Sequence, residues 1–106
     1  MHSNQPYSEQ VRLKALEWAD LDAAARMLEE GKTTYLAQRM AVLGDIPVSK
    51  AEKQVKASPD WADYIKKMVN AKTRANKARI ELEYIKMRSW ENSGLEANKR
   101  AEMRMG

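Results

Sequence analysis

The sequence predicts an all-α protein, folded as a long antiparallel helical hairpin with a short helix at the connection, which we expect to dimerise into a four-helix bundle. Apolar and small side chains recur at alternating spacings of three and four in both halves of the chain, and turn-forming residues gather between the halves. Such spacing marks the face of a helix that packs lengthwise against another helix. The two heptad series, called here the first and second seam, are Trp18, Leu21, Ala25, Leu28, Lys32, Tyr35, Arg39 and Val42, and Tyr64, Met68, Ala71, Ala75, Ala78, Leu82, Ile85 and Ser89.

The first helix is predicted over residues 8–43, after a flexible start at residues 1–7. Ser8 is a suitable N-cap, and Glu9 places a negative charge in the first turn, where the helix dipole favours it. Gly31 interrupts an otherwise strong helical stretch. A glycine inside a helix costs about 1 kcal/mol relative to alanine, so either the helix bends there or a neighbour packs closely against its backbone.

The connection is marked by Gly44, which suits the position after a helix end, and by Pro47, which cannot continue a helix. A short helix is predicted over residues 49–57. Ser49 and Glu52 have the spacing of a capping box at its start.

The third helix is predicted over residues 59–92, with Ser58 as its N-cap and Pro59 as its first residue. Residues 92–94 read Asn-Ser-Gly and form a plausible break. Residues 95–105 are then a possible helical tail, which either forms a separate piece or continues the long helix. No stretch shows the period-two alternation of a β-strand, so we expect residues 1–106 to form a single helical-hairpin domain.

A turn centred near residue 51 predicts which residues face each other. Partners then have numbers that sum to roughly 103, which places Ala25 opposite Ala78 and Tyr35 opposite Met68. Alanine occurs at the middle of both arms and larger side chains occur toward the ends, as a close approach of the two helices at mid-length requires.

The composition of the chain favours a small protein that associates with itself. The 106 residues contain 43% hydrophobic residues but no Phe, and small apolar side chains bury little area each. Apolar side chains off the seams would be covered by a homo-oligomer. They are Leu13, Leu16, Met27, Leu36, Met40, Ile65, Met87, Trp90 and Leu95.

The chain has no cysteine, no apolar run near the roughly 20 residues of a membrane span and no secretion signal at its start. We expect a cytoplasmic protein with no membrane partner. The only histidine is His2, the carboxylates of Glu81 and Glu83 point to different helix faces, and the glycines are isolated. We therefore expect no enzymatic activity, no catalytic residue, no metal site and no cofactor.

A basic segment is the candidate for nucleic-acid binding. Residues 66–106 hold eleven Lys and Arg against five Glu, a net charge of +6, which leaves −2 for residues 1–65. One interpretation is that the acidic first arm neutralises the basic second arm. The other is that four cations, which share an arc from the outer face to one flank of the helix, contact DNA phosphates without sequence specificity. These are Lys66, Lys67, Arg74 and Lys77.

A second candidate is the C-terminal stretch that contains Trp90, Met103 and Arg104. Trp, Met and Arg are enriched at protein interfaces, so these residues predict contact with another protein. The alternative is structural, with Trp90 capping the open end of the hairpin near Val11.

The C-terminal part also resembles a known kind of protein. The segments MRSWENSG and KRAEMRM, within residues 60–106, resemble small helical proteins that are encoded in phage and prophage early regions, commonly beside recombination and single-strand-annealing genes. The resemblance implies a phage context and a hairpin fold, and it supplies no catalytic residue. We expect a non-enzymatic phage or prophage protein that acts by binding, as an accessory to DNA recombination. The alternative function is a module that inhibits or adapts a host or phage protein.

Overall fold

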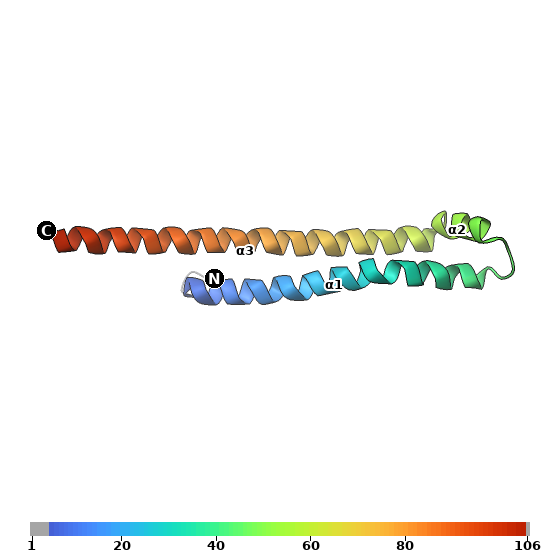
Figure 1. Ribbon diagram of the computed structural model, residues 1–106, viewed down its shortest axis with the longest axis horizontal. Coiled ribbons are helices and arrows are strands. Elements are labelled where there is room, and N and C mark those ends of the chain that lie inside the picture. The colour runs from blue at the N-terminus through green and yellow to red at the C-terminus, as the bar shows by residue number, and fades with distance from the viewer. Residues whose placement is uncertain (1–4, 106) are drawn as a thin grey trace.

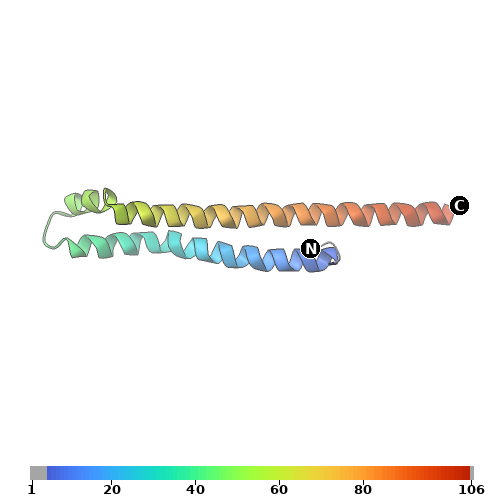
Figure 2. The same ribbon diagram turned by 180° about the vertical axis from the view of Figure 1, so that it is seen from behind.

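The computed structural model describes residues 5–105, which form three helices: α1 (Tyr7–Val42), α2 (Val48–Lys56) and α3 (Pro59–Met105). Helices α1 and α3 lie side by side and antiparallel, and α2 lies at the closed end of the hairpin, before the start of α3 (Figures 1 and 2). The described residues contain no strand. The all-α class and the two long helices joined through a short one are therefore confirmed.

Helix α1 begins earlier than expected, and Ser8 does not cap it. Pro6 is the N-cap residue, and its carbonyl accepts hydrogen bonds from the backbone N–H groups of Glu9 and Gln10, both at 3.1 Å. The side-chain amide of Gln10 also donates to the carbonyl of Gln5, at 2.8 Å. The Pro6 carbonyl thus serves two N–H groups of the first turn, and no side-chain oxygen caps the helix. The expected flexible start overlaps this turn, and residues 1–4 lie outside the described residues.

The closed end of the hairpin depends on two turn residues. Gly44 has a φ of +82°, a conformation that side-chain-bearing residues rarely adopt, and its N–H donates to the carbonyl of Ala41 at 3.2 Å. Pro47 is the N-cap of α2, which begins at Val48 without a side-chain cap hydrogen bond. The predicted capping box at Ser49 is therefore wrong, because the helix already starts one residue earlier.

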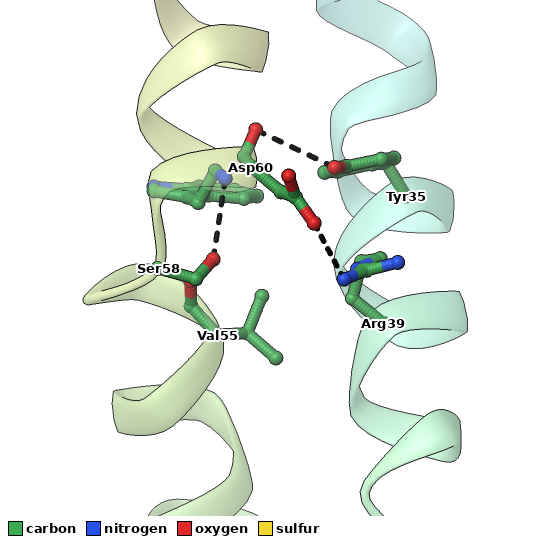
Figure 3. Close-up of polar contacts among 6 residues, drawn as sticks. Tyr35, Arg39, Val55, Ser58 and Asp60 are labelled. Atoms are coloured by element: carbon green, nitrogen blue, oxygen red, sulfur yellow. Dashed lines mark hydrogen bonds and ion pairs between the residues drawn. The ribbon is translucent and has the colours of Figure 1, made fainter.

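The start of α3 matches the prediction. The Ser58 hydroxyl oxygen accepts a hydrogen bond from the backbone N–H of Trp61 at 3.2 Å, and its own proton is donated to the Val55 carbonyl at 2.6 Å (Figure 3). Pro59 is the first helical residue. Its fixed φ and missing N–H suit that position.

The end of α3 differs from the prediction. The helix runs without a break through residues 92–94 and ends at Met105. The end at residue 92 is therefore wrong, and the alternative in which residues 95–105 continue the long helix is confirmed. Asn, Ser and Gly weaken a helix by less than about 1 kcal/mol each, and extending an existing helix needs no new nucleus. Gly94 does not adopt the positive φ that would end the helix.

The core of the hairpin is a thin layer of small side chains between the helices. The chain extends over 85 × 23 × 17 Å. The seam residues of both long helices are mostly half-buried or buried, whereas Val42 is exposed and lies outside the contact. The buried residues are Ala25 of α1, Ala51 and Val55 of α2, and Ala75, Ala78 and Leu82 of α3.

Gly31 is explained by close packing of a tyrosine. The Tyr64 hydroxyl donates a hydrogen bond of 2.5 Å to the backbone carbonyl of Leu28, one turn before Gly31. A Cβ atom on Gly31 would lie only 3.1 Å from this hydroxyl oxygen. The ring of Tyr64 stacks on Tyr35 at 4.5 Å between centroids, and Trp61 lies 6.3 Å from both rings. Gly31 thus makes room for an aromatic cluster of Tyr35, Trp61 and Tyr64.

The register of the hairpin is shifted from the prediction. Tyr35 stacks on Tyr64 rather than lying opposite Met68. Arg39, four residues after Tyr35, forms an ion pair of 2.6 Å with Asp60 (Figure 3). Asp60 lies four residues before Tyr64. Facing residues therefore have numbers that sum to about 99, which moves α3 by about one helical turn.

The shift follows from the position of the turn. The prediction centred the turn on residue 51 and counted the short helix as part of it. In the structure the chain reverses at residues 43–47, and α2 already belongs to the second arm. The midpoint of the hairpin therefore lies earlier in the sequence, and each residue of α1 meets an earlier part of α3.

We expect the tight contact at Gly31 to appear in a double-mutant cycle. Tyr64→Phe removes the hydrogen bond to Leu28 and should lower the free energy of unfolding by about 1 kcal/mol. Gly31→Ala should be more favourable by about 0.5–1 kcal/mol in the Tyr64→Phe variant than in the wild type, because the hydroxyl no longer crowds the new methyl group. Urea denaturation measures both effects, and equal effects in the two backgrounds would contradict the packing.

We expect enlargement of the thin core to destabilise the hairpin. Ala75→Leu should lower the free energy of unfolding by about 1–3 kcal/mol, because the added side chain must push α1 away. Ala62→Leu is the matched control, since Ala62 is exposed on the same helix. Its effect should stay within about 0.5 kcal/mol. A similar loss in both variants, measured by thermal denaturation, would show that the approach of the helices is not what limits the side chain at residue 75.

Candidate functional site

Helix α3 carries all the residues predicted to bind a partner, on two separate surfaces. The first, called the basic ridge, consists of Lys66, Lys67, Arg74 and Lys77, on the part of α3 that packs against α1. The second, called the overhang, consists of residues 90–105, which run past the start of α1 (Figure 1). No break separates the two surfaces, because α3 is one helix.

The basic ridge is open to solvent along its length. All four of its residues are exposed, and they follow about 17 Å of the helix axis. None of the four forms an ion pair with another side chain of the described residues. The seam of α3 faces α1, so the ridge occupies the outer face and one flank of the same helix.

The ion pairs between the long helices do not neutralise the ridge. Within the described part of the chain, two of the three pairs that join α1 to α3 take the cation from α1 and the carboxylate from α3. This is the reverse of the expected attraction between an acidic first arm and a basic second arm. The pairs are Lys14 with Glu81 at 2.7 Å, Arg39 with Asp60 at 2.6 Å, and Lys72 with Glu29 at 3.3 Å.

Lys14 shows how these pairs hold the open end of the hairpin. Its ammonium group bonds to Glu17 of its own helix and to Glu81 of α3, both at 2.7 Å. Hydrogen bonds to Glu17 and then Glu81 raise the pKa of Lys14 above its ordinary value. A raised pKa in the folded state stabilises the fold at pH values below the ordinary pKa, and this contribution is lost as the pH rises through the raised pKa.

The large apolar side chains of residues 90–104 in the overhang are exposed to solvent. Trp90 and Met103 are each 81% exposed, and Leu95 is 61% exposed. The structural interpretation of Trp90 as a cap of the open end is therefore wrong. At this end Tyr7, and next Tyr84, lie near the guanidinium of Arg88 and raise its pKa.

The three predicted interface residues do not form one cluster. Trp90 is separated from Met103 and Arg104 by about 20 Å along a continuous helix. Trp90 instead borders an open groove together with Met87, and the charged residues of this groove are Glu83, Lys86 and Glu91.

Sequence reasoning missed two exposed residues near this groove, Ile80 and Tyr84. Neither residue belongs to the second seam or to the apolar side chains off the seams that are named above. The available signal was the heptad spacing itself, because Ile80, Met87, Gly94 and Ala101 lie seven residues apart.

The described residues form surfaces for binding and no metal centre. No three Asp, Glu or His side chains within residues 5–105 lie close enough together to hold a metal ion. The carboxylate of Glu81 is engaged by Lys14, and that of Glu83 lies 3.7 Å from Lys86. No helix of the described residues combines the length and the apolar character that crossing a membrane requires.

Comparisons of the chain with protein-family models, with curated proteins and with solved structures found no match. The exposed side chains of α3 and their spacing are therefore the features that bear on function.

Proposed function

We propose that this chain is a non-enzymatic binding protein whose basic ridge contacts the phosphates of a nucleic acid. The observation that supports the proposal is the exposure of four cations on one arc of α3, with no carboxylate of the described residues paired to them. Free cations on a helix attract a polyanion, and binding releases the counterions that the polyanion had condensed.

The spacing of the ridge suits a phosphate backbone rather than base edges. Its length of about 17 Å corresponds to about five phosphates of one strand at 3.4 Å each. The helix holds the four Cα positions fixed, so binding orders only the side chains. Tyr35, Trp61 and Tyr64 stack on each other at the seam, and no aromatic residue lies between Lys66 and Lys77 in the sequence to stack on bases. The contact would therefore be insensitive to sequence.

The resemblance of the C-terminal segments supports DNA as the nucleic acid and a phage or prophage protein as the context. In this interpretation the protein acts in the cytoplasm as an accessory to DNA recombination. A rod that binds phosphates without sequence specificity could follow a strand or a duplex while other proteins carry out the chemistry.

Homo-oligomerisation is part of the proposal. The chain exposes 8564 Å² of surface, whereas a compact monomer of 12.2 kDa exposes about 6,100 Å². The excess is larger than the roughly 800 Å² that each partner contributes to a standard interface. A four-helix bundle, with two hairpins side by side along their full length, is one arrangement that would cover such surface, and a contact between the ends of two hairpins is another.

A second candidate function is a protein-interaction module that inhibits or adapts a host or phage protein. The observation that favours it is the exposure of Trp90 and Met103 on a helix segment without a neighbouring helix. Large exposed apolar side chains on a rigid element are typical of binding surfaces.

We expect removal of the ridge to weaken DNA binding and to flatten its dependence on salt. Replacing Lys66, Lys67, Arg74 and Lys77 with Ala should reduce the slope of log affinity against log salt concentration by about three to four, because four phosphate contacts are lost. Fluorescence anisotropy of a labelled duplex, titrated at several salt concentrations, measures this slope.

A matched pair of double variants controls for net charge. Lys66→Ala with Lys67→Ala should flatten the slope by about two. Lys50→Ala with Lys53→Ala removes the same charge from the exposed face of α2 and should change the slope by less than about one. Equal slopes for the two variants, or no binding by the wild type at about 50 mM salt, would overturn the proposal.

A further inference from the structure

The overhang is a helix segment that the rest of the chain leaves uncovered. Every residue from Trp90 to Arg104 is exposed, and helix α1 starts at Tyr7, near Arg88. We propose that the overhang binds the overhang of a second copy of this chain in antiparallel orientation, so that two hairpins join end to end. This inference does not depend on phosphate binding, because the basic ridge lies on another part of α3.

A heptad stripe begins before the overhang and runs along it. The stripe follows alternating spacings of three and four, as the seams do, but it lies on exposed positions of α3. Such a stripe marks the face by which a helix packs lengthwise on a partner. Its members are Ile80, Glu83, Met87, Trp90, Gly94, Ala97 and Ala101, followed by Arg104.

Side-chain sizes along the stripe are complementary in an antiparallel pair. When Gly94 lies opposite the partner's Ala97, the same register places Trp90 opposite the partner's Ala101. Small residues at the centre allow the two helices to approach closely, and the large indole on each side meets a methyl group. The arrangement is symmetric, so each of these contacts occurs twice in the dimer.

The charge of the overhang selects the antiparallel orientation. Residues 90–97 carry Glu91 and Glu96, a net charge of −2. Residues 98–105 carry three cations and one carboxylate, a net charge of +2. An antiparallel pair places each acidic half beside a basic half, whereas a parallel pair places like charges together.

The open groove near the start of the overhang fits the end of the partner. In the register described above, the partner's Arg104 lies opposite Met87. Met87 lies in the groove together with Trp90, and Glu83 and Glu91 flank it. Lys86 also lines the groove, but its ammonium group is 3.7 Å from Glu83. The aliphatic stem of the arginine would pack on Met87 while its guanidinium meets Glu91.

The end-to-end dimer has a length that distinguishes it from a side-by-side bundle. One hairpin is 85 Å long. An overlap of residues 87–104 covers about 26 Å, so the end-to-end dimer should extend to about 145 Å. Two hairpins packed along their whole length would stay near the length of one.

Small-angle X-ray scattering and light scattering on the full chain, at several concentrations, test the arrangement. We expect the mass of a dimer with a largest dimension of about 145 Å. A monomer at every concentration up to about 200 μM would overturn the proposal and would leave the overhang to a different partner. A dimer whose largest dimension stays near 85 Å would also overturn it, in favour of the four-helix bundle.

Substitution of Trp90 tests the largest side chain of the contact. Trp90→Ala should raise the dissociation constant of the dimer at least about tenfold, because Trp is a frequent centre of binding energy at interfaces. Met27→Ala is the control, since Met27 is 75% exposed but lies on α1, away from the overhang. It should change the constant less than about twofold. Equal effects of the two substitutions would contradict the proposed contact.

A charge exchange tests the pairing of acidic with basic side chains without relying on loss of binding alone. Glu91→Lys with Glu96→Lys makes the overhang mostly basic, and Lys99→Glu with Arg100→Glu and Arg104→Glu makes it acidic. Each variant alone should be monomeric at concentrations where the wild type is dimeric, and a mixture of the two should form a heterodimer. Persistence of both homodimers, or a mixture that stays monomeric, would overturn the proposed charge pairing between the overhangs.

Discussion

The close approach of α1 and α3 is the constraint on which the other features depend. Alanine occupies the buried positions where the helices meet, so the backbones come near enough for Tyr64 to reach the carbonyl of Leu28. The missing side chain of Gly31 leaves the space for this hydroxyl. Because the layer between the helices is thin, α3 turns most of its circumference to solvent. Both candidate binding surfaces lie on this outward part of α3.

The sequence predicted the helices, their facing sides and the start of α3, but not the caps of the other two helices or the register. Ser58 caps α3 as expected, because a proline follows it and the hydroxyl can reach the N–H of Trp61. At the other two helix starts, Pro6 and Pro47 take the N-cap position and no side-chain oxygen is used. Local patterns cannot determine the register, since it depends on how many residues the turn consumes. The aromatic cluster fixes it one turn away from the expected position.

The candidate surfaces were predictable to different degrees. The exposure of the basic ridge follows from its angular position relative to the second seam, and both can be read from residue numbers. The overhang could not be recognised in this way, because residues 92–94 resemble a helix end and left open whether residues 95–105 continue the long helix. Its existence also depends on the length of α1, which begins beside Arg88 and leaves the rest of α3 without a neighbour.

The uninterrupted course of α3 links its two surfaces in a stiff geometry. Each residue of a helix adds about 1.5 Å of rise and about 100° of rotation, so the azimuth of Trp90 relative to Lys77 is set by the twelve residues between these positions. Inserting a single residue between them would swing one surface to a different side of the rod, whereas inserting seven would nearly restore the phase. The number of residues in this segment therefore sets both the distance and the relative direction of the two partners that bind these surfaces.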